Sequence, residues 1–334
     1  MSTLDILCSL LFELSSDYRL RILQELNKET ANVTKLSKML ELTTQETSRQ
    51  VCRLKEIGLL RKDDKGLCHL TSYAELVLKQ LEGLDFLSSH KEYFKSHSLA
   101  HIPEDLILRI GDMADTVYLP SIAQTFYNVE KLVKEAESYV WLVNDQMPFN
   151  IVSELGKSLE RGTRNKAIQT KHFVYPSSQV REIFQSYDKN VLPTIWRSRN
   201  IGALENRLDD QVDVFLFISE KQATIGFPLN NGDFDYLVFS GSNKRFHDWC
   251  SDVFNYCWEK AQPMEAVVKE PCEWAMDNPE ALEALERIIT GQKTRLRKDL
   301  ASELEKRQLI SKGNITRLGY YVRSHLQKRD FQKR

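Results

Sequence analysis

The stretch Thr43–Thr71 constrains the fold of this chain more than any other part of its sequence. Thr43 and Glu46 have the spacing of a capping box, in which each side chain accepts the backbone amide hydrogen of the other residue. Three residues then recur at helical spacing and predict one buried helix face, continued by Ile57: Thr47, Val51 and Leu54. Gly58 is suited to end this helix, because glycine adopts positive φ easily.

The opposite face of the predicted helix is polar. Its side chains are of types that pair with base edges in the major groove of double-stranded DNA, where arginine pairs with guanine and glutamine with adenine. Those we expect to enter the groove are Thr44, Gln45, Ser48, Arg49 and Arg53. Leu59-Leu60 begins a strand, Asp63–Gly66 predicts a hairpin turn, and Leu67–Leu70 predicts the returning strand. We expect three hairpin cations to hold flanking phosphates: Arg61, Lys62 and Lys65.

Two helices are predicted before this stretch, at Asp17–Leu26 and within 33–40. Helix, helix, short turn, helix and hairpin is the order of a winged helix-turn-helix. Residues 17–78 resemble the N-terminal domain of ArsR/MarR-like winged-helix regulators, with Ser48-Arg49 and the run Leu54–Leu60 as they typically stand there. This resemblance implies a sequence-specific transcriptional regulator. The alternative for this domain is a winged helix used only for protein contacts.

The length of 334 residues predicts two or three domains. We expect a winged helix at 1–80, a helical linker or dimerisation segment at 81–120, an α/β sensor domain at 121–262, and a basic winged-helix-like or capping segment at 263–334. The six cysteines are scattered without a CxxC pair, which argues for reduced thiols. No apolar run is long enough to span a bilayer and no signal peptide is evident, so we expect a cytoplasmic chain with no membrane contact.

The net charge of −1 hides an uneven distribution. Residues 34–66 hold 8 Lys/Arg against 5 Asp/Glu, and residues 287–334 hold 14 against 4. The remainder is acidic, above all residues 67–286. Basic segments on either side of an acidic centre suit a polyanion that is held near the ends of the chain.

The middle of the chain alternates strands with helices, which predicts a partly parallel sheet and makes the whole a multi-domain α/β protein. It follows a helix, Tyr73–Leu87, of the kind that pairs with its twin in dimeric winged-helix regulators. The predicted strands are Tyr139–Val143, Ile168–Tyr175, Val212–Ile218, Ala223–Phe227 and Asp235–Ser240. The predicted helices are Phe149–Arg161, Val180–Tyr187 and Phe246–Glu259.

Residues 121–261 are similar to the sensor region of archaeal winged-helix regulators known as methanogenesis regulatory proteins. Four runs carry this resemblance: Ile218–Ala223, Gly226–Pro228, Gly232–Tyr236 and Trp249-Cys250. That region in turn resembles half of a phospholipase-D-type fold, whose catalytic members use an H-x-K-x4-D signature with histidine as nucleophile. Neither His172 nor His247 begins this signature, so we expect no enzyme activity. The alternatives are a degenerate hydrolase of that type tethered to nucleic acid, and a protein-only interaction scaffold.

Aromatic and charged residues gather near the ends of the predicted strands and favour a pocket for a small polar or anionic effector. They are Trp141, Asn144, Asp145, Gln146, Trp196, Arg197, Arg199, Asp235, Tyr236 and Trp249. Arg197 stands out, since a guanidinium group grips a carboxylate or phosphate with two hydrogen bonds. The alternative is that the aromatic residues belong to the core and the arginines form ion pairs. No nucleotide-binding motif is present, and His97 and His101 lack companions for a metal site, so no cofactor or metal is expected.

The C-terminal part holds an internal repeat. Leu54–Leu60 has a counterpart in Leu304–Ile310, and Leu70–Ala74 has one in Ile315–Gly319. With predicted helices at 279–289 and 293–307, residues 279–327 resemble a second, shortened winged helix without the polar helix face of the first. We expect this segment either to hold phosphates or to cap a neighbouring domain or a partner subunit.

Overall fold

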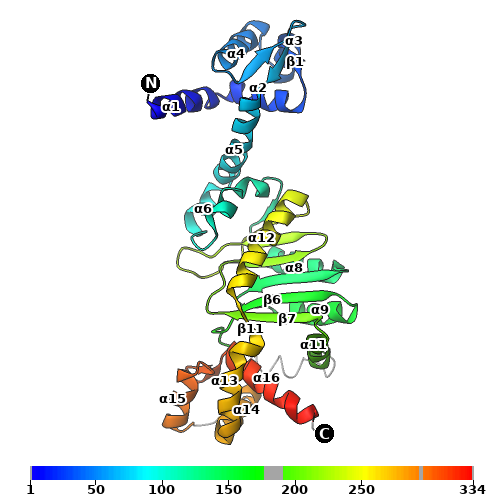
Figure 1. The fold of residues 1–334 in the computed structure, drawn as a ribbon, viewed down its shortest axis with the longest axis vertical. Coiled ribbons are helices and arrows are strands. Elements are labelled where there is room, and N and C mark those ends of the chain that lie inside the picture. Colours follow the sequence, from blue (N-terminus) through cyan, green and yellow to red (C-terminus); the bar gives the residue numbers. More distant parts are fainter. Residues whose placement is uncertain (1, 177–190, 293–295, 333–334) are drawn as a thin grey trace. The chain divides into compact units, whose positions relative to one another are not determined.

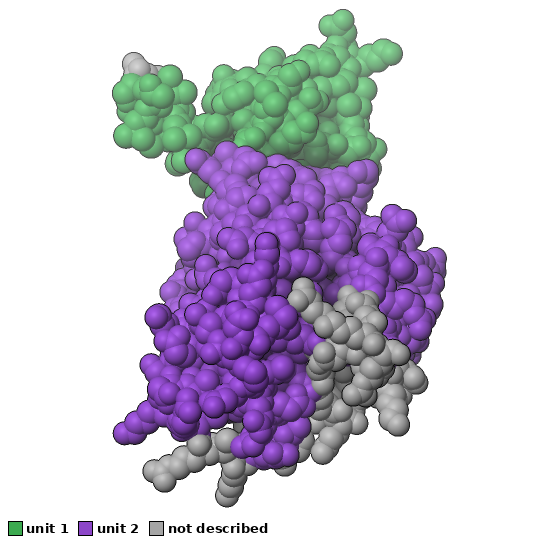
Figure 2. Space-filling view, turned by 60° about the horizontal axis from the view of Figure 1, so that its bottom comes forward, with its two compact units in different colours: residues 1–90 green, residues 91–334 purple. Residues whose placement is uncertain are grey.

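The computed structural model describes residues 2–176, 191–292 and 296–332, so the helix expected at 180–187 lies outside the described residues. The chain forms two compact units, Met1–His90 and Lys91–Arg334, which are coloured separately in Figure 2. Across the described residues, every helix is too short or too polar to cross a membrane.

The first unit is a small helical domain with one three-stranded antiparallel sheet, β1-β3-β2 (Figure 1). Its elements in chain order are α1 (Thr3–Leu14), α2 (Asp17–Lys28), β1 (Ala31–Asn32), α3 (Val33–Leu40), α4 (Thr44–Glu56), β2 (Leu60–Lys62), β3 (Leu67–Leu70) and α5 (Ser72–Ser89). The helix and hairpin predicted within 43–71 are confirmed as α4, β2 and β3. The helix predicted at 73–87 is confirmed as α5, which continues past residue 80 and brings the first unit to His90.

The core of the first unit forms where one side of each helix meets the sheet. Leu54 and Leu59 are fully buried, beside Ile22, Leu23 and Leu36 from the two preceding helices. Burying side chains of this size stabilises the folded state by roughly 1.5–3 kcal/mol each before entropy is counted. The amphipathic spacing read from the sequence is therefore what assembles this unit.

The second unit is built on an eight-stranded mixed sheet in the order β11-β7-β6-β5-β8-β9-β10-β4. Its strands are β4 (Val117–Leu119), β5 (Tyr139–Asn144), β6 (Arg164–Thr170), β7 (Leu204–Asp209), β8 (Phe215–Ser219), β9 (Ala223–Gly226), β10 (Val238–Gly241) and β11 (Gln262–Pro263). The pairs β5–β6 and β6–β7 are parallel and the others antiparallel, which confirms the partly parallel sheet. β4, β7 and β11 were not predicted, because short or polar strands lack a clear apolar pattern.

Helices cover both faces of this sheet (Figure 1). The helices before the C-terminal part are α6 (Lys91–Ser96), α7 (Glu104–Ile107), the 3-10 helix η1 (Ile110–Met113), α8 (Ile122–Glu135), α9 (Phe149–Glu160), α11 (Val191–Asn200) and α12 (Lys244–Lys260). Val140 and Leu142 face α8 and α9 in one core, whereas Trp141 stacks on Phe254 of α12 on the other face. This follows from the strand period of two, which sends neighbouring side chains to opposite faces.

Three predicted strands begin or end elsewhere, each for a local reason. The strand expected at Ile168–Tyr175 is β6, Arg164–Thr170, whose first residues pair with β5 although they are polar. β8 begins at Phe215 rather than 212, after the Asp213 carboxylate that accepts from Lys260 Nζ at 2.7 Å. β10 begins at Val238 rather than 235, because Tyr236 has a positive φ of 59° that a strand does not accommodate.

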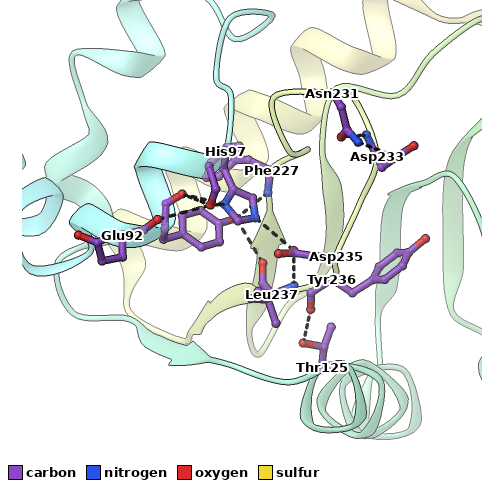
Figure 3. A network of polar contacts seen from close by, with 11 residues as sticks. Glu92, His97, Thr125, Phe227, Asn231, Asp233, Asp235, Tyr236 and Leu237 are labelled. Carbon is purple, nitrogen blue, oxygen red and sulfur yellow. Dashed lines mark hydrogen bonds and ion pairs between the residues drawn. The ribbon is translucent and has the colours of Figure 1, made fainter.

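A buried polar network holds the segment that precedes β10 (Figure 3). His97 Nε2 lies 3.1 Å from Asp235 Oδ1, and the same carboxylate oxygen accepts from Leu237 N at 3.0 Å. The His97 ring stacks on Tyr93, whose backbone oxygen lies 2.8 Å from His97 Nδ1. Because both ring nitrogens are engaged within the fold, this histidine joins α6 to the segment before β10.

The C-terminal elements repeat the end of the first unit. They are α13 (Met264–Asp277), α14 (Pro279–Thr290), α15 (Lys298–Lys306), β12 (Ile310–Ser311), β13 (Asn314–Ile315) and α16 (Arg317–Gln332). Leu59 N donates to Leu54 O at 2.9 Å, and Leu309 N donates to Leu304 O at the same distance. The helix therefore ends in the same way in both copies.

In both copies one threonine holds the backbone where it leaves the hairpin and enters the next helix. Thr71 Oγ1 donates to Gly58 O at 2.7 Å and accepts from Ala74 N at 3.2 Å. Thr316 Oγ1 donates to Gln308 O at 2.5 Å and accepts from Gly319 N at 3.1 Å. The internal repeat inferred from the sequence is thus matched hydrogen bond by hydrogen bond, although the second hairpin is shorter.

The two copies differ at the residue that ends the helix in the left-handed region. Gly58 has a φ of 77° and Gln308 a φ of 59°. A side chain in this region costs about 1 kcal/mol, so we expect Gln308→Gly to raise the free energy of unfolding by about 1 kcal/mol and Gly58→Gln to lower it by a similar amount. Urea denaturation of the full chain measures both. Gln308→Ala is the matched control, expected to change little, and a neutral Gly58→Gln would contradict the argument.

Candidate functional sites

The polar face of α4 is exposed as the sequence predicts. Thr44, Gln45, Ser48 and Arg49 are all exposed, while Thr47, Val51 and Leu54 are at most 5% exposed. Thr43 begins the helix by accepting from Glu46 N at 3.1 Å. The local sequence therefore sets both where this face starts and which side chains it presents.

The second half of the expected capping box is replaced by another contact. The Glu46 carboxylate accepts from Arg49 Nη2 at 2.9 Å and from Gln50 Nε2 at 2.5 Å. The hydrogen bond from Arg49 is the main cause that lowers the pKa of Glu46. The Glu46 carboxylate, which the sequence predicts to accept from the Thr43 amide, thus accepts instead from two donors on the next helical turn. The Arg49 side chain remains 69% exposed, so this pair is screened by solvent.

Arg53 lies differently from the other predicted contacts. Its Nη2 is 2.6 Å from Glu13 Oε1, and its guanidinium group lies over the Phe12 ring of α1. Glu13 is 7% exposed and also faces Arg19, whose Nε is 2.9 Å from Glu13 Oε2. Glu13, Arg19 and Arg53 thus form a charged cluster, the Glu13 bracket, that fixes α4 against α1 and α2. Glu13 is 40 positions from Arg53, and no local sequence pattern indicates this contact.

The hairpin between β2 and β3 presents exposed cations around an ordered turn. Arg61, Lys62 and Lys65 are exposed, and none has a carboxylate within 4 Å among the residues that the structure describes. Asp63 orders the turn by accepting from Lys65 N, Leu67 N and His69 Nε2 at 2.9–3.0 Å. The contact with His69, followed by that with Leu67 N, lowers the pKa of Asp63. Its charge is thus directed into the turn.

The ten residues predicted to form one ligand pocket are not brought together. Trp249 is fully buried on α12 and donates to Leu106 O at 2.9 Å, and Trp141 packs on the same face of the sheet. Asp235 is held by His97, and Arg197 is exposed on α11. The prediction that these residues share one pocket was therefore wrong, because strand alternation and a buried helix face separate their side chains.

Two groups of the predicted residues do line cavities. Asp145, Gln146 and Tyr236 line a polar hollow together with Asp210 and Asp233. Burial raises the pKa of Asp145, whose Oδ2 accepts from Tyr236 Oη at 2.8 Å. Trp196 and Arg199 line a separate cavity of about 130 Å³ between the sheet, α9, α11 and α16. Sequence reasoning missed its other walls, which come from the sheet, from α9 and from the C-terminal helix α16.

Several arginines in the described part of the C-terminal repeat are paired with carboxylates. Arg297 pairs with Glu280 and Asp299, Arg307 with Glu270, and Arg323 with Glu286. Among the described residues no group of three or more His, Cys, Asp and Glu is placed to hold a metal ion. The exposed polar face of α4, together with the three exposed hairpin cations, therefore marks the first copy as the candidate nucleic-acid interface.

Comparison with known proteins finds similar solved structures, TrmBL2 and Nuc among them. No protein-family model matches the chain, and no curated protein matches it. The chain is similar to TrmBL2, an archaeal chromatin protein whose structure shows a novel mode of DNA binding, with 17% identity over 74% of this chain and 94% of that one and a TM-score of 0.35. It is also similar to Nuc from Salmonella typhimurium, a phospholipase D family member, with 9% identity over 45% of this chain and 95% of that one and a TM-score of 0.31. At these TM-scores, the case for a function rests on the chain's own residues.

The bracket around Glu13 generates a prediction about stability. Glu13→Gln leaves the buried Arg19 guanidinium without its carboxylate, so we expect the free energy of unfolding of the first unit to fall by about 3 kcal/mol. Urea denaturation of the full chain measures this change. Glu25→Gln is the matched control: it removes an ion pair with Lys28, whose side chain is 69% exposed, and we expect a loss below about 1 kcal/mol. Equal losses would show that Arg19 does not depend on Glu13.

Proposed function

We propose that this chain is a sequence-specific DNA-binding transcriptional regulator whose first unit is a winged helix-turn-helix. The observation that carries the proposal is the exposed polar face of α4, flanked by the exposed cations of the β2–β3 hairpin. A helix of this width fits the major groove, where side chains read base edges, and cations beside it neutralise phosphates. In this arrangement Arg49 and Gln45 read bases, and Arg61, Lys62 and Lys65 hold the backbone.

The release of Arg49 from Glu46 is part of this proposal. Their contact is solvent-exposed, so exchanging the carboxylate for a guanine edge costs little. Arg53 is assigned a positioning role through Glu13 in addition to any contact with DNA. The protein-only alternative lacks a reason for three exposed hairpin cations without described carboxylate partners.

We propose that the second unit acts without catalysis and serves as a sensor. His247 Nε2 lies 2.7 Å from Ser219 O, and a carbonyl oxygen only accepts, so this nitrogen carries the proton and is not a free nucleophile. His172 Nε2 is 2.8 Å from Asp210 Oδ1. The contact of His247, with the missing H-x-K signature at both histidines, favours a binding role over a tethered hydrolase.

We further propose that two copies associate through the first unit. α1 exposes Leu4, Leu7 and Leu11 at helical spacing, each between 48% and 67% exposed. α5 exposes Tyr73, Leu76 and Leu84. Exposed apolar side chains in this density are typical of surfaces that bind another chain, and a second copy supplies two symmetric recognition helices.

Base reading is tested by a pair of variants. We expect Arg49→Ala to weaken binding to a selected duplex by about 1–3 kcal/mol and to relax one base position, with little effect on a random duplex. We expect Lys62→Ala to weaken both duplexes alike and to reduce the salt slope by about one. Fluorescence anisotropy at several salt concentrations measures these changes.

Lys134→Ala is the control for this pair, because Lys134 is an exposed cation of α8 in the second unit, outside α4, the hairpin and the helices proposed to form the dimer. It should leave both affinities unchanged. An equal loss for Arg49→Ala on selected and random duplexes would refute base reading by α4.

The dimer is tested by charging α1. We expect Leu7→Glu combined with Leu11→Glu to convert a dimer into a monomer, because four carboxylates would face each other across a desolvated surface. Sedimentation equilibrium measures the mass. Leu108→Glu is the control, since Leu108 is 76% exposed in the second unit and lies outside α1 and α5. A wild-type chain that sediments as a monomer at micromolar concentration would contradict the association.

A further inference from the structure

The cavity between the sheet and α16 combines apolar walls with one buried and one half-buried arginine. Its volume is about 130 Å³. Leu142 of β5, Leu155 of α9 and Trp196 of α11 supply the apolar walls, and Arg199 and Arg317 reach it from α11 and α16. A second cavity adjoins it and shares Trp196, Arg199 and Tyr321. A dry cavity of about 150 Å³ holds a benzene ring, so the space suits a ligand of that order.

The hydrogen-bond acceptors that the described residues offer these two arginines are neutral. Arg317 is 2% exposed, and it donates from Nη1 to Thr170 O at 2.9 Å and from Nε to Tyr175 Oη at 3.2 Å. Arg199 Nε donates to Asn206 Oδ1 at 3.0 Å, and its guanidinium group lies over the Tyr321 ring. Within the described ranges no carboxylate lies within 4 Å of either group. Each guanidinium has five N–H donors, so several remain for a ligand.

Another buried arginine of α16, Arg323, has a carboxylate partner. Arg323 is 3% exposed and pairs with both carboxylate oxygens of Glu286. The acidic group that Arg317 influences is Asp145: burial raises the pKa of this carboxyl group, and Arg317 offsets part of that rise. Asp145 is itself held by Tyr236 Oη at 2.8 Å. A buried cation without a close anion is unfavourable, and a bound anion removes that cost.

We propose that this cavity binds a small carboxylic acid with an apolar body, of the aromatic or branched-chain class. The carboxylate lies between Arg199 and Arg317, which provide the bidentate donors that carboxylates favour. The apolar body packs against Leu142, Leu155 and Trp196. This inference places the sensor function proposed above in a defined site, and only its link to DNA rests on that proposed function.

The site lies where the C-terminal repeat joins the sheet. Arg317 is the first residue of α16, its N donates to Phe173 O at 2.8 Å, and Tyr175 N donates to Ile315 O at 2.9 Å. A ligand held by Arg199 and Arg317 therefore bridges α11 and α16. Binding favours the arrangement in which both guanidinium groups reach the anion, which is how a ligand shifts a conformational equilibrium.

Calorimetric titration of the full chain, without DNA, tests the site. The probes are benzoate, phenylacetate and 3-methylbutanoate, each compared with its uncharged amide and with acetate. We expect at least one of the three acids to bind about tenfold or more tightly than its amide, and acetate to bind more weakly than that acid, because charged hydrogen bonds and apolar burial both contribute. Absence of binding by all three acids at millimolar concentration, or equal binding of acid and amide, overturns the proposal.

Two variants locate the binding. We expect Arg199→Gln to weaken the best acid about tenfold or more, whereas Arg197→Gln, at the exposed neighbour outside the cavity, should leave its affinity unchanged. Val152→Trp fills the cavity from α9 and should abolish binding while circular dichroism shows a folded chain. Equal effects of the two arginine variants, or unchanged binding in Val152→Trp, overturn the assignment. Probe binding by a chain that fails to bind DNA would refute the proposed function alone.

Discussion

The burial of one face of α4 is the constraint on which the first unit depends. Thr47, Val51 and Leu54 are at most 5% exposed, and a helix that buries these positions must turn positions 45, 48 and 49 outward. The exposed face is thus a geometric consequence of core packing. Glu13 adds a second constraint on the position of α4, because its carboxylate faces both Arg19 and Arg53. A recognition surface needs this second constraint, because side chains read base edges only from a fixed helix.

Much of the first unit could be predicted from the sequence because its signals are local. Thr43 begins α4 and Gly58 lies at its end within a few residues of the stretch that they organise, and the hairpin turn is set by Asp63. The Glu13 bracket could not be predicted, since it joins residues 40 positions apart and depends on how α1 folds back. The same holds for Glu46, whose choice between the Thr43 amide and the Arg49 guanidinium depends on side-chain conformations.

In the second unit the presence of strands was predictable, but the grouping of side chains was not. Trp141 and Leu142 are adjacent in sequence, yet one faces α12 and the other faces the cavity. Sequence alone predicts the alternation without saying which face each helix covers. The cavity also needs α16, more than 100 positions after β6, so its second arginine lay outside any local pattern. Arg197 was selected because a guanidinium group can grip an anion with two hydrogen bonds, but Arg199 lines the cavity and Arg197 is exposed outside it.

The two copies of the repeat share one backbone structure, a helix followed by a hairpin, but differ in the side chains that it carries. Both end the helix and return from the hairpin through the same hydrogen bonds, centred on Thr71 and Thr316. The residue after each threonine differs: Ser72 is exposed, whereas Arg317 is 2% exposed and lines a cavity. The same backbone geometry places this residue at the start of a helix in both copies. The side chain that stands there faces solvent in the first copy and the cavity in the second. The hairpin of the first copy exposes Arg61, Lys62 and Lys65 to solvent, whereas the second copy also places one cation, Arg317, inside the protein at the wall of a cavity.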